Sequence, residues 1–203
     1  MNRKKIYKII SLLLFFVIVS FLILFLISKK VSPVGRPENK IPDVFVSVNE
    51  INWPEQYNPK NNPPIYISNE IKISAPPEKV WNNLIRAESY PKWYEGASNV
   101  KVQRYKDGIL RENSIFTWKT AGFEIVSKIK EFVPPYRLSW EFRNSTFVGY
   151  HAWLVIPMVD GGTKVITEEV QYGFLAKLQS IFSPDNLRKM HDKWLMGLKN
   201  ISE

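Results

Sequence analysis

Residues 73–96 read ISAPPEKVWNNLIRAESYPKWYEG, a stretch in which an apolar strand end meets two prolines and then a helical pattern. The strand ends at the Ala-Pro-Pro step, where Pro76 bars helical backbone at Ala75 and Pro77 suits a first helical turn. The apolar positions that follow recur at helical spacing and form one face: Val80, Trp81, Leu84 and Ile85. The sequence therefore predicts a strand over residues 65–74 and a helix over residues 77–86.

Six further segments downstream have strand-like composition and are separated by turn-forming residues, such as the Asp-Gly-Gly at 160–162. They span residues 98–105, 114–120, 123–132, 136–142, 147–156 and 163–172. In the fourth segment, Leu138, Trp140 and Phe142 alternate with polar side chains. This period of two indicates an antiparallel sheet with one buried face.

The chain closes with a helical pattern. Residues 174–182 predict a short first segment, and Pro184 after Ser183 marks the start of a longer helix. One apolar stripe of about four turns then follows at steps of three and four: Leu187, Met190, Trp194, Leu198 and Ile201. Because a long helix with one apolar face packs on another element, we expect an α+β fold in which this helix lies on the sheet.

The N-terminal part of the chain is strongly apolar. Residues 9–27 contain 19 residues without a charge, enough to cross the hydrocarbon core of a bilayer. A cleaved signal peptide has a shorter apolar region of about 7–15 residues and a small-residue cleavage site, which this sequence lacks. The pattern predicts a basic tail over residues 1–8 and a transmembrane anchor over residues 9–28. The basic residues slightly favour a cytoplasmic N-terminus, so we expect a single-pass membrane protein whose remaining chain lies outside the cytoplasm.

Residues 29–64 hold seven of the 14 prolines. Such a composition favours extended backbone, so we interpret this stretch as a Pro-rich linker before a single domain at residues 65–203. Residues 43–48 (DVFVSV) and Trp53 are open to two interpretations, either packing on the surface of the domain or belonging to a mobile stalk.

The net charge of +9 arises largely outside the domain. From Ile65 onward there are 19 basic and 15 acidic residues, a balance of 19 − 15 = +4, and the two signs are interspersed. This pattern is typical of an ordinary solvated surface, so we expect no nucleic-acid partner. The absence of cysteine excludes disulfides and thiolate metal ligands.

Several motifs agree with the order of the predicted elements. They are I-x-A-P-x-x-x-V-W from Ile73, Y-P-x-W from Tyr90, the GGTKVITEE hairpin followed by Gly173, and MHDKWLMGLK in the terminal helix. With these features, residues 65–203 resemble the SRPBCC superfamily, which has the START/Bet v 1-like helix-grip fold. Within it they resemble the polyketide cyclase/dehydrase and lipid transport group.

The resemblance implies an antiparallel sheet that curls around the terminal helix and leaves an apolar cavity between them. It places Tyr90, Trp93 and Tyr94 at or near the entrance of this cavity. Strand aromatics are then candidates for its wall: Phe116, Trp118, Trp140, Tyr150, Trp153 and Tyr172. Tyr150 and Trp153 lie on opposite faces of their strand, so which face is inward stays open. Any one of these tryptophans is also compatible with ordinary core packing.

Few polar groups are candidates for catalysis. His151 in a strand suits acid/base chemistry if it faces the cavity. Glu168 and Glu169 alternate across a strand, so one of them points to the buried side, where a carboxylate is paired or has a shifted pKa. His191 and Asp192 are adjacent on a helix, about 100° apart, and form no dyad. We interpret His191 as a residue at the edge of the apolar stripe.

Metal and nucleotide sites have no support in the sequence. Two histidines 40 positions apart, without cysteine, offer no recognisable ligand spacing, so we expect no metal. The sequence contains no G-x-G-x-x-G, P-loop or G-x-S-x-G motif, and we expect no cofactor.

Three functions are consistent with these features. The leading hypothesis is a membrane-tethered module that binds a lipid or other hydrophobic small molecule without chemistry of its own. The second is a cyclase- or hydrolase-type enzyme that uses His151, Glu168 or Glu169. The third is a protein-interaction module of the cell envelope, whose partners the sequence does not identify. Its contact patch would be the aromatic turn, which carries Tyr90, Trp93 and Tyr94.

Overall fold

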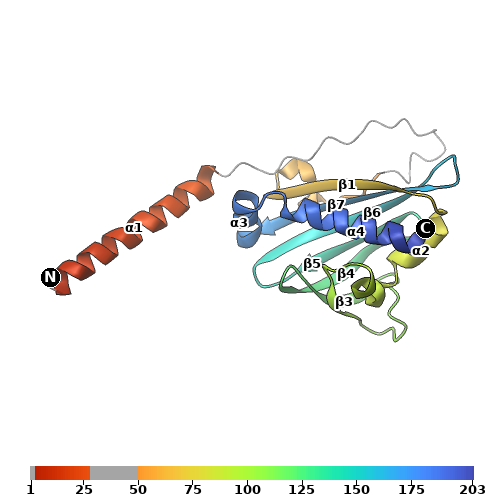
Figure 1. Ribbon diagram of the computed structural model, residues 1–203, viewed down its shortest axis with the longest axis horizontal. Helices are drawn as coiled ribbons and strands as arrows, with labels where there is room; N and C mark the ends of the chain where they lie inside the picture. Colours follow the sequence, from red (N-terminus) through yellow and green to blue (C-terminus); the bar gives the residue numbers. More distant parts are fainter. Residues whose placement is uncertain (1–2, 28–49) are drawn as a thin grey trace.

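The computed structural model describes residues 3–27 and 50–203 of the chain (Figure 1). Within these residues, a seven-stranded antiparallel sheet has the order β1-β7-β6-β5-β4-β3-β2. Its strands are β1 (Ile65–Ile73), β2 (Ser98–Val102), β3 (Ile115–Thr120), β4 (Phe123–Val133), β5 (Arg137–Arg143), β6 (Phe147–Pro157) and β7 (Thr163–Gly173). The helices are α1 (Arg3–Ile27), α2 (Pro77–Leu84), α3 (Phe174–Phe182) and α4 (Asn186–Ser202), with 3-10 turns η2 (Glu55–Tyr57), η3 (Pro59–Asn61) and η4 (Ala87–Lys92). The curved sheet lies against α4, which confirms the predicted α+β helix-grip fold (Figure 1).

Residues 73–96 run from the end of β1 through α2 and η4. Helix α2 begins at Pro77, as predicted, and the buried Tyr90 of η4 donates a hydrogen bond of 2.7 Å to the Leu84 carbonyl at the end of α2. Gly197 on α4 allows the turn after η4 to approach closely, because a Cβ at this position would lie 2.3 Å from the Trp93 carbonyl oxygen. The aromatic turn therefore packs against both α2 and α4.

Helix α4 buries its apolar stripe on the concave face of the sheet. Trp194 lies at the centre of this contact, with only 2% of its surface exposed. Its ring is stacked on Tyr94 at 4.7 Å between centroids and lies 5.2 Å from Trp153 and 5.4 Å from Trp118. Such aromatic contacts add to the free energy gained by burying their apolar surface, and they form the main core of the domain.

The opposite face of β6 and β7 is also covered. Residues 50–64, which fall within the predicted linker, form an outer segment that packs on this face. Tyr57 is buried and stacks on Tyr150 at 5.5 Å, and Trp53 meets Tyr66 edge-on at 6.1 Å. Both faces of the central strands are therefore buried, the concave face by α4 and the convex face by the outer segment.

The membrane prediction requires correction. No helix in residues 3–27 or 50–203 is both long enough and apolar enough to cross a membrane. The anchor at residues 9–28 is therefore not supported, and the predicted single-pass membrane localisation, with its extracytoplasmic domain, is wrong. Residues 43–48 lie outside the described parts of the chain.

Candidate functional site

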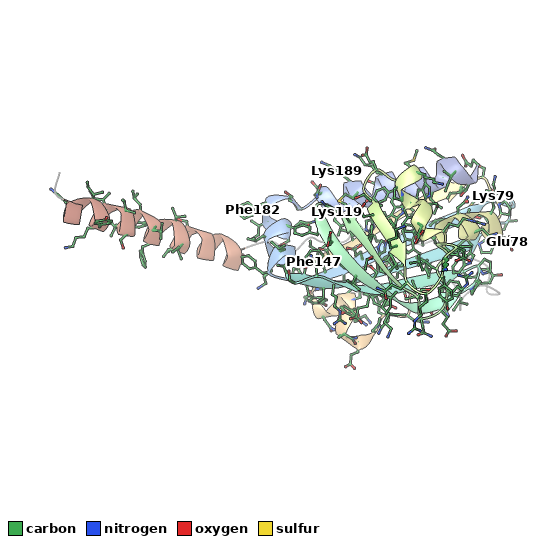
Figure 2. All side chains as sticks on the ribbon, turned by 90° about the horizontal axis from the view of Figure 1, so that it is seen from below. Glu78, Lys79, Lys119, Phe147, Phe182 and Lys189 are labelled. Atoms are coloured by element: carbon green, nitrogen blue, oxygen red, sulfur yellow. The ribbon has the colours of Figure 1, made fainter. Side chains whose placement is uncertain are left out.

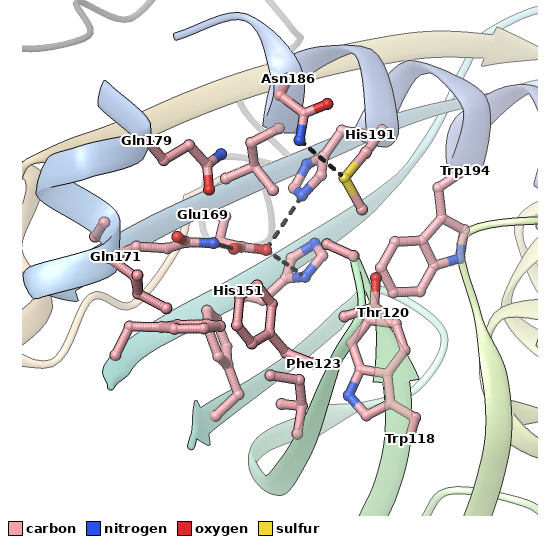
Figure 3. A pocket seen from close by; sticks show the side chains of 18 of the residues that line it. Trp118, Thr120, Phe123, His151, Glu169, Gln171, Gln179, Asn186, His191 and Trp194 are labelled. Atoms are coloured by element: carbon pink, nitrogen blue, oxygen red, sulfur yellow. Dashed lines mark hydrogen bonds and ion pairs between the residues drawn. The ribbon is translucent and has the colours of Figure 1, made fainter. Parts of the chain in front are cut away.

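A cavity lies between α4, α3 and the concave face of the sheet (Figure 3). Its volume is about 70 Å³, measured as the space open to the centres of water molecules. Phe123 lines this cavity although 40% of its surface is exposed, so its ring lies at the mouth. Phe147 also lines the cavity and lies at the end of the domain opposite Glu78 and Lys79 (Figure 2). The cavity therefore opens near α3.

Three polar residues meet in the wall of this cavity, and we name them the inner cluster: His151, Glu169 and His191 (Figure 3). His151 on β6 stands directly opposite Glu169 on β7 in the antiparallel register. His191 comes from α4, one turn before Trp194 on the helix face that contacts the sheet. All three are at most 5% exposed. The strand pairing and the docking of α4 therefore set the geometry of the cluster.

One carboxylate oxygen joins the two imidazoles. Glu169 Oε2 lies 3.0 Å from His151 Nδ1 and 3.1 Å from His191 Nε2. The other carboxylate oxygen, Oε1, accepts a hydrogen bond of 2.6 Å from Gln171 Nε2. The two imidazole rings are stacked, with 4.6 Å between centroids and 12° between planes. Glu169 thus has the hydrogen bonds that a buried carboxylate requires.

The remaining ring nitrogens differ in their surroundings. His151 Nε2 lies 2.6 Å from the Thr167 hydroxyl oxygen. His191 Nδ1 is buried and has no hydrogen-bond partner within residues 50–203. If both imidazoles are neutral and donate to Glu169, the Thr167 hydroxyl donates to His151, and His191 Nδ1 keeps an unused lone pair.

Burial and charge act in opposite directions on the cluster. Burial lowers the pKa of His151 to about 4, although the neighbouring Glu169 carboxylate opposes this shift. Burial alone would raise the pKa of Glu169, but the charge and hydrogen bonds of His151 and His191 hold that pKa below its usual range. The arrangement near neutral pH is therefore a carboxylate beside a neutral His151 imidazole.

The structure divides the predicted aromatic residues into three groups. Tyr94, Trp118 and Trp140 line the cavity. Four others lie in the surrounding core without lining it: Tyr90, Trp93, Phe116 and Trp153. Tyr150 and Tyr172 lie on the convex face beneath the outer segment, because even-numbered positions of β6 and β7 point away from α4.

The same alternation separates the predicted carboxylates. Glu169 faces the cavity with His151, whereas Glu168 points to the convex face, where it accepts hydrogen bonds of 3.0 Å from the Tyr66 and Ser68 hydroxyls. Two of the three candidate catalytic residues therefore meet in one site, and Glu168 lies outside it.

Sequence reasoning missed His191 of the inner cluster and two hydrogen-bond partners of the cluster, Gln171 and Thr167. A signal for His191 was present, because it falls in step with Leu187, Trp194 and Leu198 on the buried stripe of α4. Gln171 and Thr167 share the parity of Glu169 along β7. The expectation of no metal rested on spacing along the chain, which does not describe three donors that converge from β6, β7 and α4.

Comparison with solved structures supports the fold. A hypothetical protein from Helicobacter pylori aligns with a TM-score of 0.72 and 28% identity, covering 76% of this chain and 97% of that chain. The di-domain ARO/CYC protein BexL of the BE-7585A biosynthetic pathway aligns with a TM-score of 0.55 and 15% identity, covering 68% of this chain and 50% of that chain. A START superfamily protein from Mycobacterium smegmatis gives 0.50 and 15%, covering 67% and 92%. At such identities the last two show only the fold.

Comparison of sequences gives a more specific result than comparison of structures. A search of curated proteins found no match to this chain. A family model described as polyketide cyclase/dehydrase and lipid transport matches residues 64–197, a range that includes the whole sheet and most of α4. The match agrees with the START and ARO/CYC labels of the structural neighbours and confirms the predicted SRPBCC resemblance. The chain therefore belongs to the polyketide cyclase/dehydrase and lipid transport family.

Proposed function

We propose that this protein binds a largely apolar small molecule, of lipid or polyketide type, between the sheet and α4. A polar group of the ligand then lies beside the inner cluster. The observation that carries the proposal is a buried carboxylate with two imidazoles in the wall of a largely apolar cavity. Ligand sites commonly combine such apolar walls with a few polar groups that orient the ligand.

The wall of the cavity suits rings or acyl chains. Its apolar part is dominated by aromatic side chains: Tyr94, Trp118, Phe123, Trp140, Phe142, Phe147 and Trp194. Aromatic side chains offer large rigid surfaces, so they gain free energy by burying a ligand while losing little conformational entropy. The fold of the family also suits this role, since it is consistent with hydrophobic-ligand binding or cyclase-type activity.

The inner cluster favours a ligand with a hydrogen-bond donor, such as a hydroxyl group. Glu169 accepts from its neighbours, and His191 Nδ1 is an acceptor without a partner in the described chain. A purely apolar ligand would leave that buried nitrogen unpaired, which costs about 1–3 kcal/mol. The cluster therefore favours a hydroxylated ligand over a plain hydrocarbon.

The size of the cavity implies movement at its mouth. A space of about 70 Å³ for water centres holds several waters, whereas drug-sized ligands occupy pockets of roughly 300–1,000 Å³ by other measures. Phe123 and Gln179 line the cavity and are both partly exposed. We expect these side chains to turn outward when a ligand enters.

Native extraction tests the proposal directly. The full chain is purified under native conditions and extracted with organic solvent, and the extract is examined by mass spectrometry. A fluorescent fatty acid and a fluorescent sterol are titrated in parallel. We expect about one bound molecule per chain and a change in tryptophan fluorescence, because Trp118, Trp140 and Trp194 line the site.

A matched pair of variants locates the binding. Gln179→Phe narrows the cavity and should weaken probe binding at least tenfold. Met196→Phe places the same ring on an exposed position of α4 that does not line the cavity, and should leave binding unchanged. A folded protein that yields no extracted molecule and binds neither probe would contradict the proposal.

A cyclase-type enzyme is the second candidate. A carboxylate and two imidazoles, groups that transfer protons, lie in the cavity wall and favour this candidate. Cyclisation of a polyketide starts by removing a proton between two carbonyl groups, so proton exchange into a 1,3-diketone in heavy water tests the activity by NMR. We expect exchange that Glu169→Gln abolishes and Glu168→Gln retains. Exchange no faster than in buffer would exclude this candidate.

A further inference from the structure

We propose that His151, Glu169 and His191 bind a divalent transition-metal ion, with zinc(II) as the ion that best suits the donors. The inference does not depend on the proposed function, because the site is complete without an organic ligand. Two imidazole nitrogens and one carboxylate oxygen form the donor set of several catalytic zinc sites, in which a fourth position stays open.

The spacing of the donors fits a single ion. The candidate ligand atoms of the three side chains all lie within 4.8 Å of one another. Both nitrogens face the same oxygen, Glu169 Oε2, at 3.0 and 3.1 Å. In a tetrahedral zinc site with bonds of about 2.0–2.1 Å, neighbouring ligand atoms lie about 3.3 Å apart. A zinc ion would therefore take the place of the two bridging protons after small side-chain shifts, and the imidazole protons would then lie on His151 Nε2 and His191 Nδ1.

Outer hydrogen bonds orient two of the three ligands. With Nδ1 of His151 on the metal, Nε2 carries the proton and donates to the Thr167 oxygen, which already lies 2.6 Å away. Gln171 holds the second oxygen of Glu169 at 2.6 Å, which leaves Oε2 to ligate. Such outer partners are typical of metal sites, where they set the tautomer and direction of each ligand.

Charge also favours a cation at this position. Glu169 is 5% exposed, and within residues 50–203 its side-chain partners are His151, His191 and Gln171, none of them a lysine or an arginine. A divalent ion would offset the negative charge of this buried carboxylate.

The cavity supplies the open coordination position. All three donors line it, so water or a polar ligand group can reach the metal from the cavity side. A metal here would polarise that group.

Metal analysis tests the inference on the full chain, purified without a polyhistidine tag or chelator. Elemental analysis by mass spectrometry should find close to one zinc per chain, and iron in its place would support the site with a different ion. The protein is then stripped with a chelator and titrated with cobalt(II). We expect a visible absorption band that saturates at one equivalent and disappears when zinc is added.

Variants on one strand provide the control. Glu169→Gln should weaken cobalt(II) binding at least 100-fold, whereas Glu168→Gln, on the opposite face of β7, should bind like the parent protein. Thr167→Val removes only the outer partner of His151 and should weaken binding about tenfold. This variant keeps the test valid if Glu169→Gln fails to fold.

Two results would overturn the site. One is a folded parent protein with no metal after purification and no cobalt(II) band at one equivalent. The other is equal binding by the parent, Glu169→Gln and Thr167→Val. Neither result affects extraction of an apolar ligand, so failure of this site and failure of the proposed function are distinguishable.

Discussion

Both faces of the β6–β7 pair bury a carboxylate, but the two carboxylates have different partners. On the concave face Glu169 meets two imidazoles beside a cavity, whereas on the convex face Glu168 meets two hydroxyls beneath the outer segment. Both carboxylates are about equally buried, at 5% and 4% exposure. Burial of a carboxylate therefore does not identify a site; its partners and an adjacent cavity do.

The aromatic side chains of the two faces also differ in their surroundings. Trp194 on the concave side contacts several large rings from the sheet and the aromatic turn, and part of its surface faces the cavity. Tyr57 on the convex side contacts Tyr150 and Tyr172 and holds a short peripheral segment. The concave face carries the main core of the domain, and the convex face closes the sheet against solvent.

Truncating one tryptophan on each face should give the largest difference. We expect Trp194→Ala to lower the free energy of unfolding by about 3–5 kcal/mol, because it removes the central ring of the core. Trp53→Ala, at a half-buried position of the outer segment, should cost about 1–2 kcal/mol. Urea unfolding of both variants measures the values, and equal losses would break the contrast between the faces.

Releasing the outer segment should have a smaller and more local effect. Tyr57→Ala removes the stacked contact with Tyr150, and we expect a loss of about 1–2 kcal/mol. Proteolytic cleavage within residues 50–64 should become several-fold faster, while zinc content and probe binding stay at the parent level. A parallel loss of metal would mean that the convex face supports the inner cluster.

Alkaline pH should give the smallest difference in stability between the two faces. Burial raises the pKa of both Tyr90 and Tyr57 above the ordinary value near 10, and Tyr90 is the more deeply buried. Because the folded-state pKa is the higher one, this contribution to stability is complete below pH 10 and is lost as the pH rises further.

Phenylalanine variants isolate each tyrosine. Tyr90→Phe should flatten the fall in stability above pH 10 more than Tyr57→Phe does, as measured by urea unfolding at several pH values. Tyr90→Phe should also lower stability at pH 7 by about 1 kcal/mol, since the hydrogen bond to Leu84 is lost. A steeper fall for Tyr90→Phe than for the parent protein would contradict this account.

Most of the fold followed from local pattern. The paired prolines placed the start of α2, and strand-like composition between turn-forming residues placed every strand of the sheet to within a few residues. Strand β2 ends at Val102 rather than at the predicted Tyr105, and nearby Arg104 has a left-handed φ of 70°. Such a backbone turn depends on contacts that a propensity pattern does not include.

The site was predicted only in part. His151 emerged as a candidate because an imidazole that faces the cavity suits acid/base chemistry. Glu169 emerged together with Glu168, because one of the two carboxylates had to point to the buried side. His191 was interpreted as a residue at the edge of the apolar stripe, because adjacent helical positions point about 100° apart and Asp192 does not pair with it. In the structure Asp192 accepts a hydrogen bond from Asn69. The partner that matters to His191 is 22 residues away on β7, and no rule of spacing connects a helix to that position.

By itself the sequence determined which residues share a face. It separated Glu168 from Glu169 by strand parity and aligned His191 with Leu187 and Trp194 by helical period. Only the tertiary structure decided which face turned toward α4 and that two histidines 40 positions apart would meet at one oxygen. The physical reason is that local periodicity fixes relative side-chain directions, whereas inward and outward depend on long-range packing on both sides of the sheet.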